Sequence, residues 1–208
     1  MKKILLSLVA ASTIFVSCDN ASKTKTTEDA GKTEEVAIKE TAKIDSLTLA
    51  WTGYKTTAKT PVSGVFKNVE VSGEDLSAEE PAEMFDGATF TATVASLFSG
   101  NEIRDPKLKD IFFGTMANTA ALKGTLHVKE EGTVLEVTMN DVTKEVPVTT
   151  SFENGVYTVE GDVHLADFSA MAAVEALAKA CYELHTGIDG VSKTWDEAHF
   201  KGAVYLAK

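Results

Sequence analysis

Apolar and polar residues alternate along most of the chain from residue 46 onward. Leu47, Leu49 and Trp51 are separated by a threonine and an alanine. A two-residue period is typical of strands with one face in the core. The period recurs at 47–52, 61–71, 89–98, 120–128, 133–139, 142–150, 156–166 and 195–206. Turn sequences such as Asn154-Gly155 separate these segments, so we predict about eight short antiparallel strands in a barrel or a sandwich.

One stretch has a different period. Between Phe168 and His185, apolar residues recur every three or four positions, at 171, 174, 177, 178, 181 and 184. This spacing predicts one amphipathic helix of about five turns. Cys181 lies on the apolar face of that helix, which favours a buried, inert thiol over a nucleophile.

The segment from Ser99 to Phe113 interrupts the strand pattern and predicts a structured corner. Pro106 prevents a regular helix from running through it. Arg104 is the only arginine of the chain, and its planar guanidinium forms paired hydrogen bonds that lysine cannot reproduce. Arg104 and Asp105 form either a catalytic pair or a structural lock. We favour the lock, because structural ion-pair networks often resemble active sites.

The first residues are typical of a processing signal. Lys2 and Lys3 precede the apolar run Ile4–Val16, which ends at Cys18. The run is too short to span a bilayer comfortably, and a cysteine at this point predicts a bacterial lipoprotein whose thiol receives diacylglycerol. The alternatives are an ordinary signal peptide with an incidental cysteine, or a short membrane anchor. We therefore expect a signal peptide at 1–17 and anchorage in the bacterial envelope, at either membrane and either face.

Residues 18–45 follow as an acylated cysteine and a tether. The segment mixes Thr, Lys, Glu and Ala without an aromatic residue, and such a composition cannot offset the entropy of ordering. Coil statistics give it a reach of roughly 30 Å. Residues 46–208 are then a single domain of ordinary size. With Cys18 acylated, Cys181 has no cysteine partner in the chain, so no intrachain disulfide is expected.

Charge and composition exclude several functions. The net charge of −11 becomes about −13 once the segment with Lys2 and Lys3 is removed, which argues against nucleic acid and against electrostatic docking to anionic lipid. The four histidines, at 127, 164, 185 and 199, lie in separate segments without metal-site spacing. No hydrolase, phosphate-loop or dinucleotide motif is present. We expect no cofactor, no metal and no catalytic residue.

Several segments taken in order resemble the YceI-like family of lipocalin-like β-barrel proteins. They are Trp51–Lys55, Val62–Phe66, Ser99–Asn101 with Arg104-Asp105, Leu108 and Phe112-Phe113, then Leu122–Leu126, Asp141–Lys144 and Asp167-Phe168. The likeness spans most of the chain from Leu47 to Leu206. Two features depart from the family pattern: Asp141 stands where a glycine is usual, and the helix after Phe168 is longer and richer in alanine.

The resemblance implies an extended, eight-stranded antiparallel barrel with one helix against it. It also implies an elongated apolar cavity that holds a polyisoprenoid or a fatty amphiphile, for sequestration or transport. The candidate lining residues are Trp51, Phe66, Phe90, Val94, Phe98, Phe112, Phe113 and Leu126. For any single one of the large apolar residues, plain core packing is favoured over contact with a ligand. Two other functions stay open: a filled barrel that binds proteins, and an enzyme acting on lipid through His185 with Tyr182 or Asp105.

Overall fold

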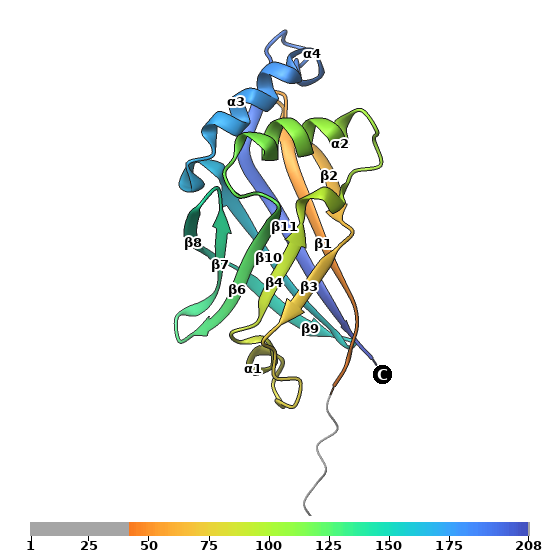
Figure 1. Ribbon diagram of the computed structural model, residues 1–208, viewed down its shortest axis with the longest axis vertical. Coiled ribbons are helices and arrows are strands. Elements are labelled where there is room, and N and C mark those ends of the chain that lie inside the picture. The colour runs from red at the N-terminus through yellow and green to blue at the C-terminus, as the bar shows by residue number, and fades with distance from the viewer. Residues whose placement is uncertain (1–41, 208) are drawn as a thin grey trace, which may run out of the picture. The chain divides into compact units, whose positions relative to one another are not determined.

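The computed structural model describes residues 42–207 and shows a mostly β domain (Figure 1). The predicted signal peptide, Cys18 and nearly all of the tether lie outside these residues. Strands form a six-stranded sheet, β5-β2-β1-β11-β10-β9, and a five-stranded sheet, β3-β4-β6-β7-β8. Every pairing is antiparallel. The strands are β1 Ile44–Lys55, β2 Thr60–Phe66, β3 Val69–Ser72, β4 Thr89–Thr93, β5 Leu97–Phe98, β6 Ala121–Lys129, β7 Gly132–Met139, β8 Val142–Pro147, β9 Thr149–Glu153, β10 Val156–His164 and β11 Thr194–Leu206.

The antiparallel β class is confirmed, but two sheets replace the single eight-stranded barrel of the prediction. Three expected strands are each divided in two, between β2 and β3, between β4 and β5, and between β8 and β9. Asn68 holds the first break, because its backbone N–H donates to Ser96 Oγ at 3.0 Å and its side chain donates to Thr93 at 3.3 Å. Pro147 ends β8, where it has no N–H to continue the ladder. At all three of these breaks the chain passes from one sheet to the other.

The ordered domain begins slightly before the predicted boundary at residue 46. Ile44 already pairs with Leu206, and the N–H of Ala207 donates to the carbonyl of Lys43 at 2.7 Å. The first and last strands are therefore neighbours along their whole length, near the centre of the six-stranded sheet (Figure 1).

Helices are short and gather mainly at one end of the sheets, with α1 at the opposite end (Figure 1). They are α1 Pro81–Phe85, α2 Arg104–Pro106, α3 Met171–Ala180 and α4 Tyr182–His185. A π-helical turn, Lys107–Phe112, continues α2. Among residues 42–207, no helix is long and apolar enough to cross a bilayer.

The prediction of one five-turn helix over residues 168–185 is wrong in its extent. Phe168 ends a 3₁₀ turn, and Ser169 then takes a left-handed conformation with φ of 54°. Cys181 divides the remainder into α3 and α4. The apolar period marks the buried face in the middle of the segment, where Val174, Leu177 and Cys181 are buried, but Met171 and Leu184 at its two ends are exposed.

The corner at Ser99–Phe113 is locked by a hydrogen-bond network around Ser99. The Asp105 carboxylate accepts from the Ser99 N–H at 3.0 Å and from the Ser99 hydroxyl. The Arg104 guanidinium donates to Ser99 Oγ at 2.8 Å and to the Ser99 carbonyl at 3.1 Å. One serine thus joins both charged side chains and fixes the path from β5 into α2.

Replacing Arg104 by lysine should destabilise the domain by about 1–3 kcal/mol, because an ammonium cannot span the Ser99 hydroxyl and carbonyl together. Urea unfolding measures the loss. In a Ser99→Ala background the same change should cost clearly less, since one of the two acceptors is already gone. Equal costs in the two backgrounds would contradict the lock.

Candidate functional site

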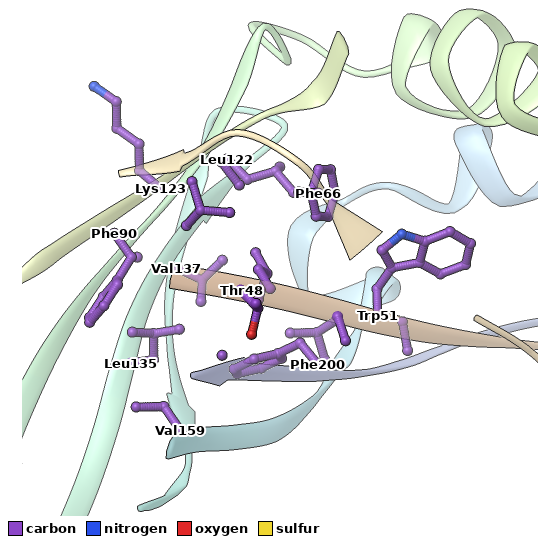
Figure 2. Close-up of a pocket in the computed structure, with 18 of the residues that line it drawn as sticks. Thr48, Trp51, Phe66, Phe90, Leu122, Lys123, Leu135, Val137, Val159 and Phe200 are labelled. Atoms are coloured by element: carbon purple, nitrogen blue, oxygen red, sulfur yellow. The ribbon is translucent and has the colours of Figure 1, made fainter. Parts of the chain in front are cut away.

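A cavity of about 210 Å³ lies between the two sheets, and nearly all of its wall is apolar. Figure 2 shows Phe66, Trp51 and Phe200 around the space, with Phe90, Leu135 and Val159 farther along it. The Lys123 ammonium points away from this group. β1, β2, β4, β6, β7, β10 and β11 all contribute side chains, so the alternation of each strand places its apolar face here.

Five of the eight predicted lining residues lie on the cavity wall. They are Trp51, Phe66, Phe90, Phe112 and Phe113. The rings of Phe66 and Phe113 pack edge to face with their centroids 6.4 Å apart. The rings of Phe112 and Phe113 pack in the same way with their centroids 5.0 Å apart. The aromatic end of the cavity is therefore built by the corner segment together with β1 and β2.

The other three predicted residues lie elsewhere. Val94 is buried in the main core, and Leu126 is fully buried in a second core cluster with Phe85. Phe98 is 42% exposed, and the Lys67 ammonium lies 3.4 Å from its ring centroid. Unbroken alternation from Phe90 would place Phe98 on the same face of the strand, but the 3₁₀ turn Val94–Ser96 changes the alternation. As a result Leu97, not Phe98, lines the cavity.

Sequence analysis missed further wall residues, chiefly from the later strands. They include Leu97, Leu122, Leu135, Val137, Val159 and Phe200. Strand alternation alone could have found most of them, because they occupy the apolar positions of β6, β7, β10 and β11. Leu97 had no such signal, since its position depends on the turn before it.

Gly64 makes room for the Trp51 indole. The two residues are directly paired between β2 and β1. A Cβ on Gly64 would lie 2.5 Å from Trp51 Cζ2 and 2.7 Å from the carbonyl oxygen of Phe98. One of these neighbours is backbone, so a rotamer change alone could not relieve the contact.

Replacing Gly64 by alanine should therefore lower the free energy of unfolding by about 1–3 kcal/mol, the usual cost of overpacking, and shift the Trp51 fluorescence. Gly53→Ala is the matched control. Gly53 lies on β1, and a Cβ added there would have no neighbour within 4 Å, so its substitution should change stability by less than about 1 kcal/mol. If urea unfolding gives the two variants equal stability, the proposed steric role of Gly64 is wrong.

Two polar atoms in the wall have no hydrogen-bond partner among the described residues, namely Trp51 Nε1 and the Tyr157 hydroxyl. Tyr157 is 2% exposed and stacks on Phe85 with ring centroids 4.7 Å apart. Burial raises the Tyr157 pKa, and the nearby Thr150 hydroxyl lowers it by a smaller amount. An otherwise apolar wall therefore carries one unpaired indole donor and one unpaired phenol.

A second chamber of about 290 Å³ adjoins the first on the side of the helices. The two share part of their lining, and the shared residues are Trp51, Leu108, Phe112, Leu165 and Ala198. In contrast to the interior cavity, the second chamber also carries charged and polar side chains. These are Lys55, Arg104, Lys107, His185 and Glu197.

The groups considered for lipid chemistry do not line one chamber. His185 lies on the second chamber, and its Nδ1 is 2.6 Å from Thr194 Oγ1. Burial lowers the His185 pKa, and the charges of Lys55 and Lys107 lower it further. Tyr182 is 58% exposed, and the Asp105 carboxylate is engaged with Ser99. Within residues 42–207, no three His, Cys, Asp or Glu side chains gather in a group that could hold a metal ion.

Comparison with known proteins identifies the family to which the chain belongs. Residues 23–194 match the model of the YceI-like domain, a match that begins inside the predicted tether. A comparison with curated protein sequences finds no match. Two solved structures are similar in fold. One is a polyisoprenoid binding domain from Saccharophagus degradans implicated in plant cell wall breakdown, with 12% identity, a TM-score of 0.58 and coverage of 79% of this chain and 95% of that chain.

The other is BcnA from Burkholderia cenocepacia, with 16% identity, a TM-score of 0.51 and coverage of 80% of this chain and 100% of that chain. Identities this low relate the folds and carry no residue roles across. The family model, however, matches well over half of the sequence. The protein therefore belongs to the YceI-like domain family.

Proposed function

We propose that this protein binds an amphiphile with a long apolar chain, of isoprenoid or fatty acyl type, inside its β domain. The observation that carries the proposal is the apolar cavity between the sheets. The similar domain from Saccharophagus degradans is a polyisoprenoid binding domain, which supports the same class of ligand. The role is non-enzymatic: sequestration or transport of the bound molecule.

The size of the cavity sets how such a chain would lie. An apolar cavity of about 150 Å³ takes up one benzene molecule, so the interior space of about 210 Å³ suits a segment of an apolar chain. A longer chain would continue past the shared wall of Trp51 and Phe112 into the second chamber. Each buried methylene contributes about 0.8 kcal/mol, so a modest segment is enough for firm binding.

A solid barrel that serves as a protein-interaction module is less well supported. Closely packed cores contain few voids larger than a water molecule, whereas this interior leaves a continuous space lined by large side chains. The lipid-modifying enzyme is weaker again, because His185, Tyr182 and Asp105 do not converge.

Anchorage is the second part of the proposal. Cys18, as the first residue after signal cleavage, would carry the acyl chains and hold the domain at a bacterial membrane. A diacylglycerol supplies two chains, and two are needed for stable attachment. The tether would then let the domain reach ligands at the bilayer surface.

Titration with geranylgeraniol tests the binding claim. Full-length protein freed of bound lipid should change its tryptophan emission saturably, because Trp51 lines both chambers and Trp195 lines the second. One binding site per chain is expected. Absence of a saturable response to prenyl alcohols, fatty alcohols and fatty acids alike would overturn the proposed function.

A further inference from the structure

The second chamber carries positive charge in a strongly acidic protein. The chain has a net charge of −11, yet Lys55, Arg104 and Lys107 all line this one space. Among the described residues that line it, Glu197 is the only carboxylate, and the Lys59 ammonium neutralises it at 2.7 Å. The concentration of cations here runs against the overall composition.

The three cations are held in place by neutral groups. Lys55 Nζ donates to the Leu184 carbonyl at 3.0 Å, and Lys107 Nζ donates to the Ala180 carbonyl at 2.9 Å. Arg104 donates to Ser99. Among residues 42–207 none of the three forms an ion pair. Each ammonium has three donors, so Lys55 and Lys107 keep donors for a further acceptor while their side chains stay fixed.

The pKa of His185 is affected by the same positive charges. It lies beside these cations, and Lys55 on β1 and Lys107 after α2 both lower its pKa, in addition to the effect of burial. A neutral imidazole with cationic neighbours is a site where an anion would be stabilised. The chamber is therefore electrostatically suited to a negative group.

The boundary with the apolar cavity carries a donor without a partner. Trp51 lines both chambers, and its buried Nε1–H donates to no acceptor among the described residues. A buried donor left unpaired is unfavourable. The nitrogen itself has almost no accessible surface, so an oxygen of a ligand lying across this boundary would satisfy it once the indole turned toward the chamber.

The far end of the apolar cavity offers no such surroundings. There the Tyr157 hydroxyl lies among Phe85, Val159 and Val204, and the Lys123 ammonium points away from the cavity. An ionised group placed there would lose its water with no compensating charge. The polarity of the two ends thus sets one direction for a bound amphiphile.

We propose that the ligand is an anionic amphiphile, an inference that rests on the proposed function. Its carboxylate or phosphate occupies the second chamber against Lys55, Lys107 and Arg104, and its acyl or prenyl chain passes Trp51 into the apolar cavity. The shared chemistry is an oxyanion on a long apolar chain; a fatty acid and a prenyl phosphate are its two sources.

Matched probes test the charge directly. Full-length protein freed of lipid is titrated with palmitate against hexadecanol, and with geranylgeranyl phosphate against geranylgeraniol. In each pair the anion should bind roughly tenfold tighter, the worth of about one charge-assisted hydrogen bond. The pair in which the anion binds more tightly than the alcohol by the larger factor identifies the ligand as a fatty acid or as a prenyl phosphate. The preference should shrink in high salt, because screening weakens exposed charge interactions.

Three lysine variants and one tryptophan variant locate the effect. Lys55→Gln and Lys107→Gln should each reduce the anion preference, the ratio of the two affinities within a pair, several-fold. Lys109→Gln is the control, since Lys109 lies in the same π-helical turn as Lys107 but outside both chambers. Trp51→Phe, which keeps an aromatic ring and removes the donor, should weaken both members of each pair alike or the anion more.

Three different failures are distinguishable. Alcohols and anions that bind equally tightly would overturn the anionic-head inference while leaving apolar-chain binding intact. Lysine variants that reduce the preference no more than Lys109→Gln would overturn the assignment of the head to this chamber. If no probe of either kind binds, the proposed function itself fails.

Discussion

Val137→Phe should abolish the binding of apolar chains and leave the domain folded with nearly unchanged stability. Val137 projects from β7 onto the cavity wall, so a benzyl group in place of the isopropyl group fills space that a ligand would otherwise use. Affinity for geranylgeraniol should fall at least tenfold. The free energy of unfolding should change by less than about 1 kcal/mol, because the added ring enters a cavity and not a packed core.

Val146→Phe is the matched control for this prediction. Val146 is equally buried, on the neighbouring strand β8, but does not line the cavity. Overpacking there should cost about 1–3 kcal/mol and spare binding. If Val137→Phe destabilises the domain as much as Val146→Phe and binding survives, the interior is packed and ligands bind elsewhere.

Cys18→Ala should release the protein from the membrane almost completely. The apolar run Ile4–Val16 is too short for a stable span, and the acidic chain has little attraction to anionic lipid. Membrane sedimentation of expressing cells measures the distribution, and intact mass spectrometry measures the loss of the diacylglycerol mass.

The other cysteine provides the control. Cys181 is 7% exposed in the core, so Cys181→Ala should stay with the membrane and keep the lipid mass. Retention of Cys18→Ala in the membrane fraction after a high-salt wash would contradict acyl anchoring and point to the apolar run itself as the anchor.

The strand pattern predicted the β class and most of the wall because alternation is a local property. Trp51, Phe66 and Phe90 each lie on an uninterrupted strand, where every second side chain faces inward. Phe98 follows a 3₁₀ turn, and that single change of phase moved it to the surface. Leu126 lies on a regular strand and faces inward as expected, but it packs in the second core cluster and not on the cavity.

The division into two sheets and the broken helix have the same kind of cause. Asn68 and Pro147 stop strands through hydrogen bonds, or the lack of one, that no two-residue period records. Neither Cys181 nor Ser169 is a helix-breaking residue type such as proline or glycine, yet their backbone angles end the helical segments. Periodicity identified the buried face and could not identify these ends.

The second chamber was beyond sequence reasoning because distant segments form it. Lys55 comes from β1, Lys107 from the turn after α2, and His185 from α4. Arg104 was recognised as a structural residue of the corner, and the structure adds that it also faces this chamber. Only the folded arrangement places these side chains around one space.

Mass spectrometry of the molecules extracted from natively purified protein tests the central claim most directly. The full chain, expressed with its own signal sequence and purified without added lipid, should release an amphiphile with a long apolar chain at about one molecule per domain, and Val137→Phe prepared in parallel should release far less. Wild-type protein that is reproducibly free of such a molecule, or that releases the same amount as Val137→Phe, would contradict ligand binding in the interior.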